Sequence, residues 1–243
     1  MRSSELDLSK YQSDKIENRY LQHYDPVFQP WVHKEIRLLE LGIRKGESLK
    51  LWRDYFPRGI ITGIDIILPS EFDLSERIHM FEGNQGDVQL LTMVAHEVAP
   101  EGFDIIIDDA SHIGSLTRIS FWHLFDNHLK PYGIFVLEDW GTGYWGDWAD
   151  GKNYREGESW LDKIWSGLVR RSRYFAKIPI KIPFRNHSYG MVGFVKQLVD
   201  EQGAADWTRK SVHRTAQRKS KFENILIKPS LVFIQKAQHV NSR

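Results

Sequence analysis

The sequence predicts an α/β protein built on a doubly wound, mostly parallel β-sheet. Two observations carry this prediction. Short apolar, β-branched segments alternate along the chain with longer segments of helical periodicity. The strand segments are also short and mostly apolar, as expected for parallel strands that are buried on both faces. This order of elements implies β-α-β units with right-handed crossovers.

Five strands are expected, at Ile36–Leu41, Ile60–Asp65, Ile78–Glu82, Phe103–Asp108 and Ile134–Glu138. Helices are expected between them at about Ser48–Tyr55, Val88–Val98 and Ser115–His128. Further along, the pattern predicts a helix over about Ser159–Arg173 and two late strands near Tyr189–Lys196 and Ile225–Lys236, which would complete the sheet.

Residues 1–35 precede this alternation and mix charged residues with Tyr11, Tyr20, Tyr24 and Phe28. We interpret them as helices packed on the outside of the sheet. The expected organisation is an N-terminal helical segment at 1–35 and a main domain at 36–243, with an aromatic loop at 140–150 and a basic insert at 207–221. The aromatic N-terminal segment is also a candidate surface for homo-oligomer formation.

Composition limits the classes of function. The 243 residues, 41% of them hydrophobic, suit one domain with additions. With 33 basic and 32 acidic residues, the chain lacks the basic excess of a dedicated nucleic-acid-binding domain. The absence of cysteine excludes disulfides, thiol nucleophiles and zinc–thiolate sites. We found no apolar run long enough for a membrane span and no signal-peptide core, so a cytoplasmic location is expected.

Two acidic clusters follow predicted strands. Asp109 and His112 come just after the strand that ends at Asp108, and Glu138 and Asp139 end the strand that begins at Ile134. Ligands of open α/β sheets bind at such carboxyl ends. If the two strands are neighbours, the three carboxylates converge, and oxygen ligands of this kind suit a hard cation such as Mg²⁺. The alternative is that Asp109 or Ser111 merely caps a helix that begins at about Ile113.

The first strand leads into a glycine-containing turn of the kind found in sites that bind nucleotide-like ligands. Gly42 and Gly46 permit a tight turn that ends at Ser48, but neither the P-loop nor the dinucleotide fingerprint is present. Asp65 closes the second strand, where an acid can bind ribose hydroxyls. A ribose-bearing cofactor without a dominant phosphate requirement fits these features, and S-adenosylmethionine is such a cofactor.

Three polar residues after the third strand, Asn84, Gln85 and Asp87, could surround the adenine of this cofactor. Taken singly, Asp65 or Asp87 could equally be a turn or cap residue.

The aromatic loop contains Trp140, Trp145 and Trp148 among glycines and could stack on sugar rings or planar ligands. It could also simply cover an edge of the core. The basic insert is typical of a solvated loop, with phosphate or nucleic-acid binding as the alternative.

Taken together, several of these motifs carry a family resemblance. They are Glu40-Leu41-Gly42, Gly46-Glu47-Ser48-Leu49, Gly63-Ile64-Asp65-Ile66, Asp108-Asp109-Ala110-Ser111-His112 and Leu137-Glu138-Asp139, with Asp14-Lys15 and Tyr20-Leu21-Gln22-His23-Tyr24 near the start. The chain resembles the class I S-adenosylmethionine-dependent, Mg²⁺-requiring sugar O-methyltransferases of the macrolide-tailoring, mycinamicin type. The match covers roughly residues 13–145.

The resemblance implies a Rossmann-like class I methyltransferase fold and a small-molecule sugar or polyol acceptor. It implies that Asp109, Glu138 and Asp139 hold the metal and that His112 is the general base beside Asp109. It assigns Glu40 and Asp65 to the cofactor, and we add Gly42, Ser48, Asn84, Gln85, Asp87 and Asp108 as further cofactor-binding candidates.

Two rival functions remain. A catechol-type O-methyltransferase would use the same metal chemistry on a planar diol. A non-enzymatic nucleic-acid-binding module would use the basic insert and would not need the carboxylates.

Overall fold

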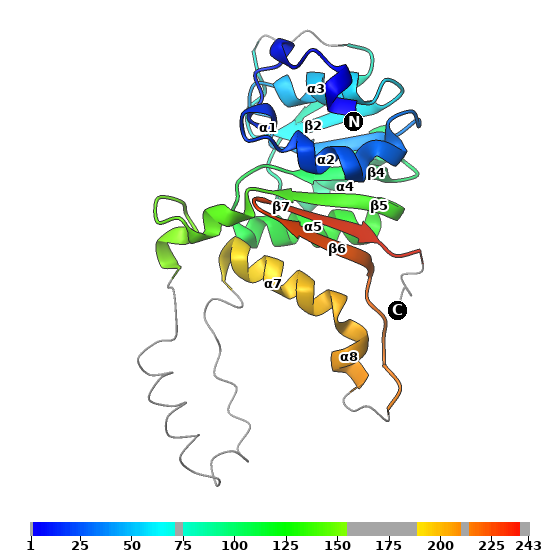
Figure 1. Cartoon of the computed structure of the whole chain (residues 1–243), viewed down its shortest axis with the longest axis vertical. Helices are drawn as coiled ribbons and strands as arrows, with labels where there is room; N and C mark the ends of the chain where they lie inside the picture. Colours follow the sequence, from blue (N-terminus) through cyan, green and yellow to red (C-terminus); the bar gives the residue numbers. More distant parts are fainter. Residues whose placement is uncertain (1, 71–74, 155–188, 210–213, 239–243) are drawn as a thin grey trace.

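The computed structural model describes residues 2–70, 75–154, 189–209 and 214–238. In this part of the chain seven strands form one sheet in the order β3-β2-β1-β4-β5-β7-β6 (Figure 1). The parallel strands are β1 (Arg37–Leu41), β2 (Ile60–Asp65), β3 (Ile78–Glu82), β4 (Phe103–Asp108) and β5 (Leu129–Glu138). The hairpin of β6 (Phe222–Lys228) and β7 (Leu231–Lys236) adds β7 antiparallel to β5.

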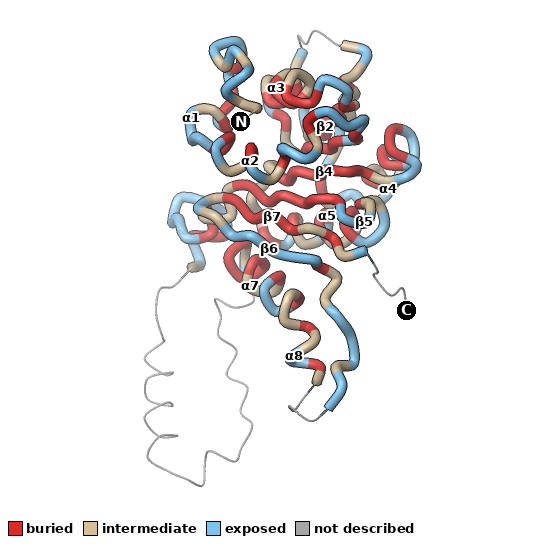
Figure 2. Tube along the Cα trace, turned by 45° about the vertical axis from the view of Figure 1, so that its right-hand side comes forward, coloured by how far each residue is buried: buried red, intermediate tan, exposed pale blue. Residues whose placement is uncertain are grey.

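Helices cover both faces of the sheet, which confirms the doubly wound prediction. Helices α2 (Leu21–Phe28) and α3 (Glu47–Tyr55) share one buried apolar cluster, to which β1 contributes Leu38. Helices α4 (Val88–Val98), α5 (Gly114–Asn127) and α7 (Gly190–Gln202) share the other, to which β1 contributes Leu39. Because successive strand residues point to opposite faces, each central strand contributes to both clusters. Figure 2 shows the resulting band of buried strands between partly exposed helices.

The five parallel strands and their helices agree with the predicted ranges. The bounds of β2, β3, β4 and α4 are as predicted, β1 and α3 differ by one residue at one end, and α5 differs by one residue at each end. Strand β5 begins five residues earlier than expected, at Leu129, because its first part pairs with Phe103 across a register shift.

The late strand predicted at Tyr189–Lys196 is wrong, because this segment begins the helix α7. Its run of Met, Val and Phe resembles a strand, but the buried residues Met191, Val195 and Leu198 recur at helical spacing. The single strand predicted at Ile225–Lys236 is also wrong. It is a hairpin that turns at Pro229 and Ser230, where Ser230 has φ 59°.

The remaining elements are short. Near the start of the chain are η1 (Arg2–Glu5), η2 (Leu8–Lys10), α1 (Asp14–Glu17) and η3 (Gln29–Trp31). The predicted aromatic loop contains η4 (Trp140–Tyr144) and leads to η5 (Gly151–Asn153). The helix predicted at Ser159–Arg173 lies outside the described residues. No helix among the described residues is long and apolar enough to cross a membrane.

The basic insert begins within α8 (Ala204–Arg209). Among its described residues, Arg218 forms a two-pronged ion pair with Glu201 and Lys221 pairs with Asp126. These two cations are therefore neutralised by acids of the same chain.

A buried lysine closes the C-terminal end of α5. The ammonium of Lys236 donates to the carbonyl oxygens of Phe125 at 2.6 Å and Leu129 at 2.8 Å, and it is 7% exposed. The carbonyl of Phe125 lies in the last turn of α5, where carbonyls lack helical partners, so a cation there satisfies it and complements the helix dipole.

We expect Lys236→Met to lower the free energy of unfolding by about 2 kcal/mol, because charge-assisted hydrogen bonds to buried carbonyls are lost. Urea titration followed by circular dichroism measures this. The control is Lys10→Met, which removes an exposed pair with Asp7 and should change stability by less than about 0.5 kcal/mol. Equal unfolding midpoints for the two variants would contradict the structural role of Lys236.

Candidate active site

The candidate site lies where the order of the strands reverses, between β1 and β4. At this point the backbones of the two strands meet: the amide of Asp109 donates to the carbonyl of Leu41 at 2.9 Å. Gly42 follows with φ 82°, and a Cβ atom there would lie 2.3 Å from the Asp109 carbonyl oxygen. Only glycine fits this position, so Gly42 has a packing role as well as the predicted turn.

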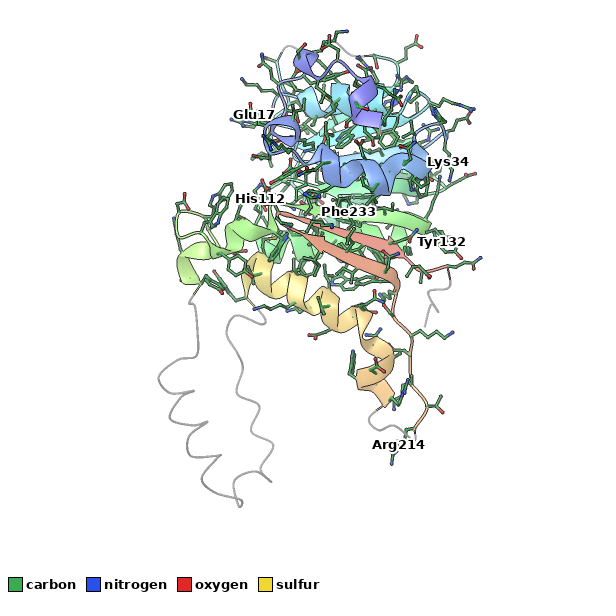
Figure 3. All side chains as sticks on the ribbon, in the orientation of Figure 1. Glu17, Lys34, His112, Tyr132, Arg214 and Phe233 are labelled. Atoms are coloured by element: carbon green, nitrogen blue, oxygen red, sulfur yellow. The ribbon has the colours of Figure 1, made fainter. Side chains whose placement is uncertain are left out.

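A cavity of about 840 Å³ opens at this end of the sheet. His112 marks this end in Figure 3, and Tyr132 marks the opposite one. Of the residues predicted for the cofactor, metal or base, those that line the cavity are Gly42, Ser48, Asp65, Asn84, Gln85, Asp109, His112 and Asp139.

Four predicted site residues do not line the cavity. Asp87 caps α4 by accepting from the amides of Gln89 and Leu90, which is the cap alternative noted from the sequence. Glu40, Asp108 and Glu138 are 0%, 3% and 1% exposed. Their carboxylates contact other side chains behind the cavity wall.

The half of the cavity beside β1 and β2 is organised by Asp65. One oxygen of its carboxylate accepts from the amides of Ile43 and Arg44, at 2.8 and 2.7 Å, and fixes the glycine turn. Among the described residues, the other oxygen has only a 3.4 Å contact, with the amide of Ile67. Asp65 can therefore accept a ligand hydroxyl while it holds the turn.

Gln85 is fixed at both ends of its amide. Its nitrogen donates to Asp108 at 3.2 Å, and its oxygen accepts from the amide of Ser111 at 2.9 Å. Ser120 also donates to Asp108, at 2.8 Å. Asp108 thus positions Gln85 and does not itself reach the cavity. Ser48 similarly donates to Glu40, at 2.7 Å.

The acidic half of the site lies at the ends of β4 and β5. These strands are neighbours, as the sequence prediction required. The acids form two groups in which one polar atom of each residue lies within 4.8 Å of the others. We call Asp109, His112 and Asp139 the outer group and Glu40, Asp109 and Glu138 the inner group. Asp109 belongs to both, whereas Glu138 and Asp139, predicted as partners, fall into different groups.

Three residues of the N-terminal segment contact these acids. Lys15 bonds to Asp109, Tyr24 donates to Glu138 at 2.5 Å, and Tyr20 donates to Asp139. Sequence reasoning missed this role: it treated residues 1–35 as an outer cover, although Lys15, Tyr20 and Tyr24 stood in the motifs that carry the resemblance. A periodic apolar face in residues 1–35 would have indicated that this segment packs against the sheet. A single sequence still contains no signal for which buried polar residues contact one another.

The acids outnumber the cations in this cluster. Burial alone would lower the pKa of Lys15, but Asp109, Glu138 and Glu40 raise it well above its usual value, so the ammonium stays charged. Burial and Glu138 also raise the pKa of Asp109, and burial raises that of Glu138 to about 7. One ammonium cannot balance these carboxylates, and the excess charge would be relieved by protons or by a divalent cation.

The donor set fits a divalent cation. Oε2 of Glu138 is buried and has no hydrogen-bond partner among the described residues. One oxygen of Asp109 contacts Lys15 and one of Asp139 accepts from Tyr20, which leaves a second oxygen on each. Carboxylate oxygens of this kind are the ligands that Mg²⁺ prefers.

His112 lies between the acids and the aromatic loop. Its Nε2 is 3.9 Å from Oδ1 of Asp109. Its ring packs edge-on against the ring of Trp148, with 5.2 Å between the two ring centroids. Burial lowers the pKa of His112, so its ring is neutral near pH 7. His112 and Asp139 both have positive φ, 53° and 51°, a costly backbone for residues other than glycine. Such strain is common at functional sites.

The aromatic loop is fixed to the body of the protein by Asp150. One oxygen of its buried carboxylate accepts from the amides of Gly114 and Met191, at 2.7 and 2.8 Å, at the beginnings of α5 and α7. The loop thereby holds Trp148 at the cavity, while Tyr144 and Trp145 remain 40% and 54% exposed.

Comparison with solved structures identifies the class. MycE methyltransferase from the mycinamycin biosynthetic pathway, in complex with Mg and SAH, superposes with a TM-score of 0.66 and 27% identity over 89% of this chain and 48% of that one. A second structure of MycE, with Mg, SAH and mycinamycin VI, gives a TM-score of 0.63. The fold is that of a class I methyltransferase.

Sequence comparison gives a narrower result. Mycinamicin VI 2''-O-methyltransferase of Micromonospora griseorubida is 40% identical over 133 residues, which are 52% of this chain and 32% of that protein. L-olivosyl-oleandolide 3-O-methyltransferase of Streptomyces antibioticus is 35% identical over 176 residues, 68% of this chain and 44% of that one. No protein-family model matches. The chain is a relative of the macrolide sugar O-methyltransferases, as the motifs indicated, and spans less than half the length of these curated relatives.

Burial raises the pKa of Asp108 to about 6, from 3.8 for an unperturbed carboxyl, and this should make stability depend on pH. A raised native pKa stabilises the protein at low pH, and the contribution is lost as pH rises from about 4 to above 6. A shift of about two pKa units corresponds to about 3 kcal/mol.

Asp108→Asn removes this titration. The wild type loses this contribution as pH rises and the variant does not. The free energy of unfolding of the variant minus that of the wild type should therefore rise by up to about 3 kcal/mol from pH 4 to pH 7. Urea titrations of both proteins at several pH values, in chelator, measure the difference. A difference that stays constant with pH would contradict this account of Asp108.

Proposed function

We propose that this protein transfers the methyl group of S-adenosylmethionine to a hydroxyl oxygen of a sugar, or of a glycosylated natural product, with the help of Mg²⁺. The observation that carries the proposal is one cavity that contains both Asp65 and the outer group. The relatives support it: their names describe methylation of sugars on macrolides, and the MycE structures contain Mg and SAH.

In this proposal the glycine turn and Asp65 bind the cofactor. Gly42 allows close approach of the backbone, and the less occupied oxygen of Asp65 accepts from the ribose hydroxyls. Gln85 and Asn84 form the wall of the same region. The turn is fixed before the cofactor binds, because Asp65 already holds two of its amides.

Asp109, Glu138 and Asp139 would hold the metal, which supplies a lower pKa to the acceptor hydroxyl bound beside it. His112 accepts the hydroxyl proton on Nε2, the ring nitrogen nearest to Asp109. The oxygen then forms a bond to the methyl carbon as the carbon–sulfur bond breaks, leaving the demethylated cofactor. Most of the acceleration comes from alignment of the oxygen with the methyl group.

The aromatic loop would contact the acceptor. Trp148 lines the cavity beside His112 and presents an apolar ring face suited to a sugar. The loop's anchor through Asp150 keeps this ring at a set distance from the base.

The first test is calorimetric titration of S-adenosylmethionine and its demethylated product into the protein, with Mg²⁺ and with chelator. We expect binding in the micromolar range, and methyl transfer to a panel of glycosylated acceptors only when Mg²⁺ is present. Absence of cofactor binding under both conditions would overturn the proposed function.

Replacement of the base should separate chemistry from binding. His112→Ala should lower the rate of methyl transfer by about 10²- to 10⁴-fold, because a general base is lost, and should leave cofactor affinity unchanged. Single-turnover assays and calorimetry measure the two effects.

The matched variant is Asp65→Ala, which should weaken cofactor binding by at least about tenfold through lost hydrogen bonds. A His112→Ala enzyme with near-normal turnover would contradict the assigned role.

A further inference from the structure

The inner group of acids is already filled by a cation. The Nζ atom of Lys15 lies 2.8 Å from Asp109, 3.0 Å from Glu138 and 3.1 Å from Glu40. An ammonium has three N–H donors, so it has one donor for each carboxylate. The lysine side chain is 1% exposed.

A divalent ion cannot share this space. Mg²⁺ needs oxygens at about 2.0–2.1 Å, and Mn²⁺ only slightly more, but the ammonium occupies the region between these oxygens. Lys15 is also held in place: Ser13 caps α1 through the amide of Lys15, and Tyr24 of the following helix is fully buried. The lysine could leave only if this part of the N-terminal segment moved.

Asp109 joins the inner group to the outer one. Its Oδ2 bonds to Lys15, while its Oδ1 faces Nε2 of His112 in the outer group. A carboxylate shared between two cations is the usual bridge of a two-metal site, whose ions lie about 3.5–4 Å apart. Here one of the two cation positions holds a lysine.

We propose that Lys15 is the fixed inner cation of a two-cation centre and restricts the site to one divalent ion, bound on the outer side of Asp109. The inference rests on the metal-dependent function proposed above. Lys15 is then a positioning residue: it binds one oxygen of Asp109, so that the other oxygen stays free for the outer ion, and it prevents a second ion from entering the inner group.

The test is the number of Mn²⁺ ions bound per chain, measured by calorimetry and electron paramagnetic resonance. The wild-type protein should bind one ion with an uncoupled spectrum. Lys15→Met should bind two, with the exchange-coupled spectrum of a carboxylate-bridged pair, because the inner group is then open.

Two further variants assign the ions. Glu40 belongs only to the inner group, so Lys15→Met combined with Glu40→Gln should return to one uncoupled ion. Asp139 belongs only to the outer group, so Asp139→Asn alone should lower Mn²⁺ affinity by at least tenfold, because Lys15 still fills the other position. This last measurement does not depend on whether Lys15→Met folds.

The outcomes are distinct. A folded Lys15→Met protein that binds one ion, or a wild type that binds two, would overturn the inference and leave the methyltransferase proposal standing. An Asp139→Asn protein with wild-type Mn²⁺ affinity would overturn the inference together with the metal-binding role proposed for Asp139, but not the binding of the cofactor. A wild type that binds no Mn²⁺ at millimolar concentration would overturn both the metal-dependent function and the inference.

Discussion

The site depends on a balance of charge at a place that water scarcely reaches. Parallel strands that end side by side bring Glu40, Asp109 and Glu138 together, and three such closely spaced carboxylates, two of them fully buried, repel one another strongly. Lys15 offsets part of this repulsion, and two tyrosines add hydrogen bonds. The sheet can therefore keep acids at its centre only because the N-terminal segment packs across its edge. In Figure 1 the dark-blue helices of this segment lie next to α3, on one side of the strands.

This dependence explains which parts of the fold can be predicted from sequence. The five parallel strands are mostly apolar and are followed by glycine or end in an acidic residue, and both signals are local. The strand predicted at Tyr189–Lys196 was wrong because the β-branched and aromatic residues of this segment are compatible with either a strand or a helix over a few residues. Only the longer spacing to Leu198 separates the two. The hairpin at 222–236 depends on a turn at Pro229 and Ser230 that the apolar pattern obscured.

The site shows the same division. Residues that follow strands, such as Asp65, Asp109 and His112, could be placed at one edge because the topology of a parallel sheet brings strand ends together. The partners of these residues could not. Lys15 is 94 positions from Asp109, and Tyr20 is 119 from Asp139. Contacts over such separations are set by packing of the whole N-terminal segment, to which no local pattern corresponds.

The backbone contact between Gly42 and Asp109 has a mechanical consequence. The turn that would carry the methyl donor and the strand end that would carry the acceptor's metal touch through main-chain atoms, with no side chain between them. The spacing of the two reactants is then fixed by peptide geometry, which is far stiffer than side-chain torsions. If the aromatic loop contacts the acceptor as proposed, substitutions in the loop could change which acceptor binds without changing the distance between the methyl donor and the metal site.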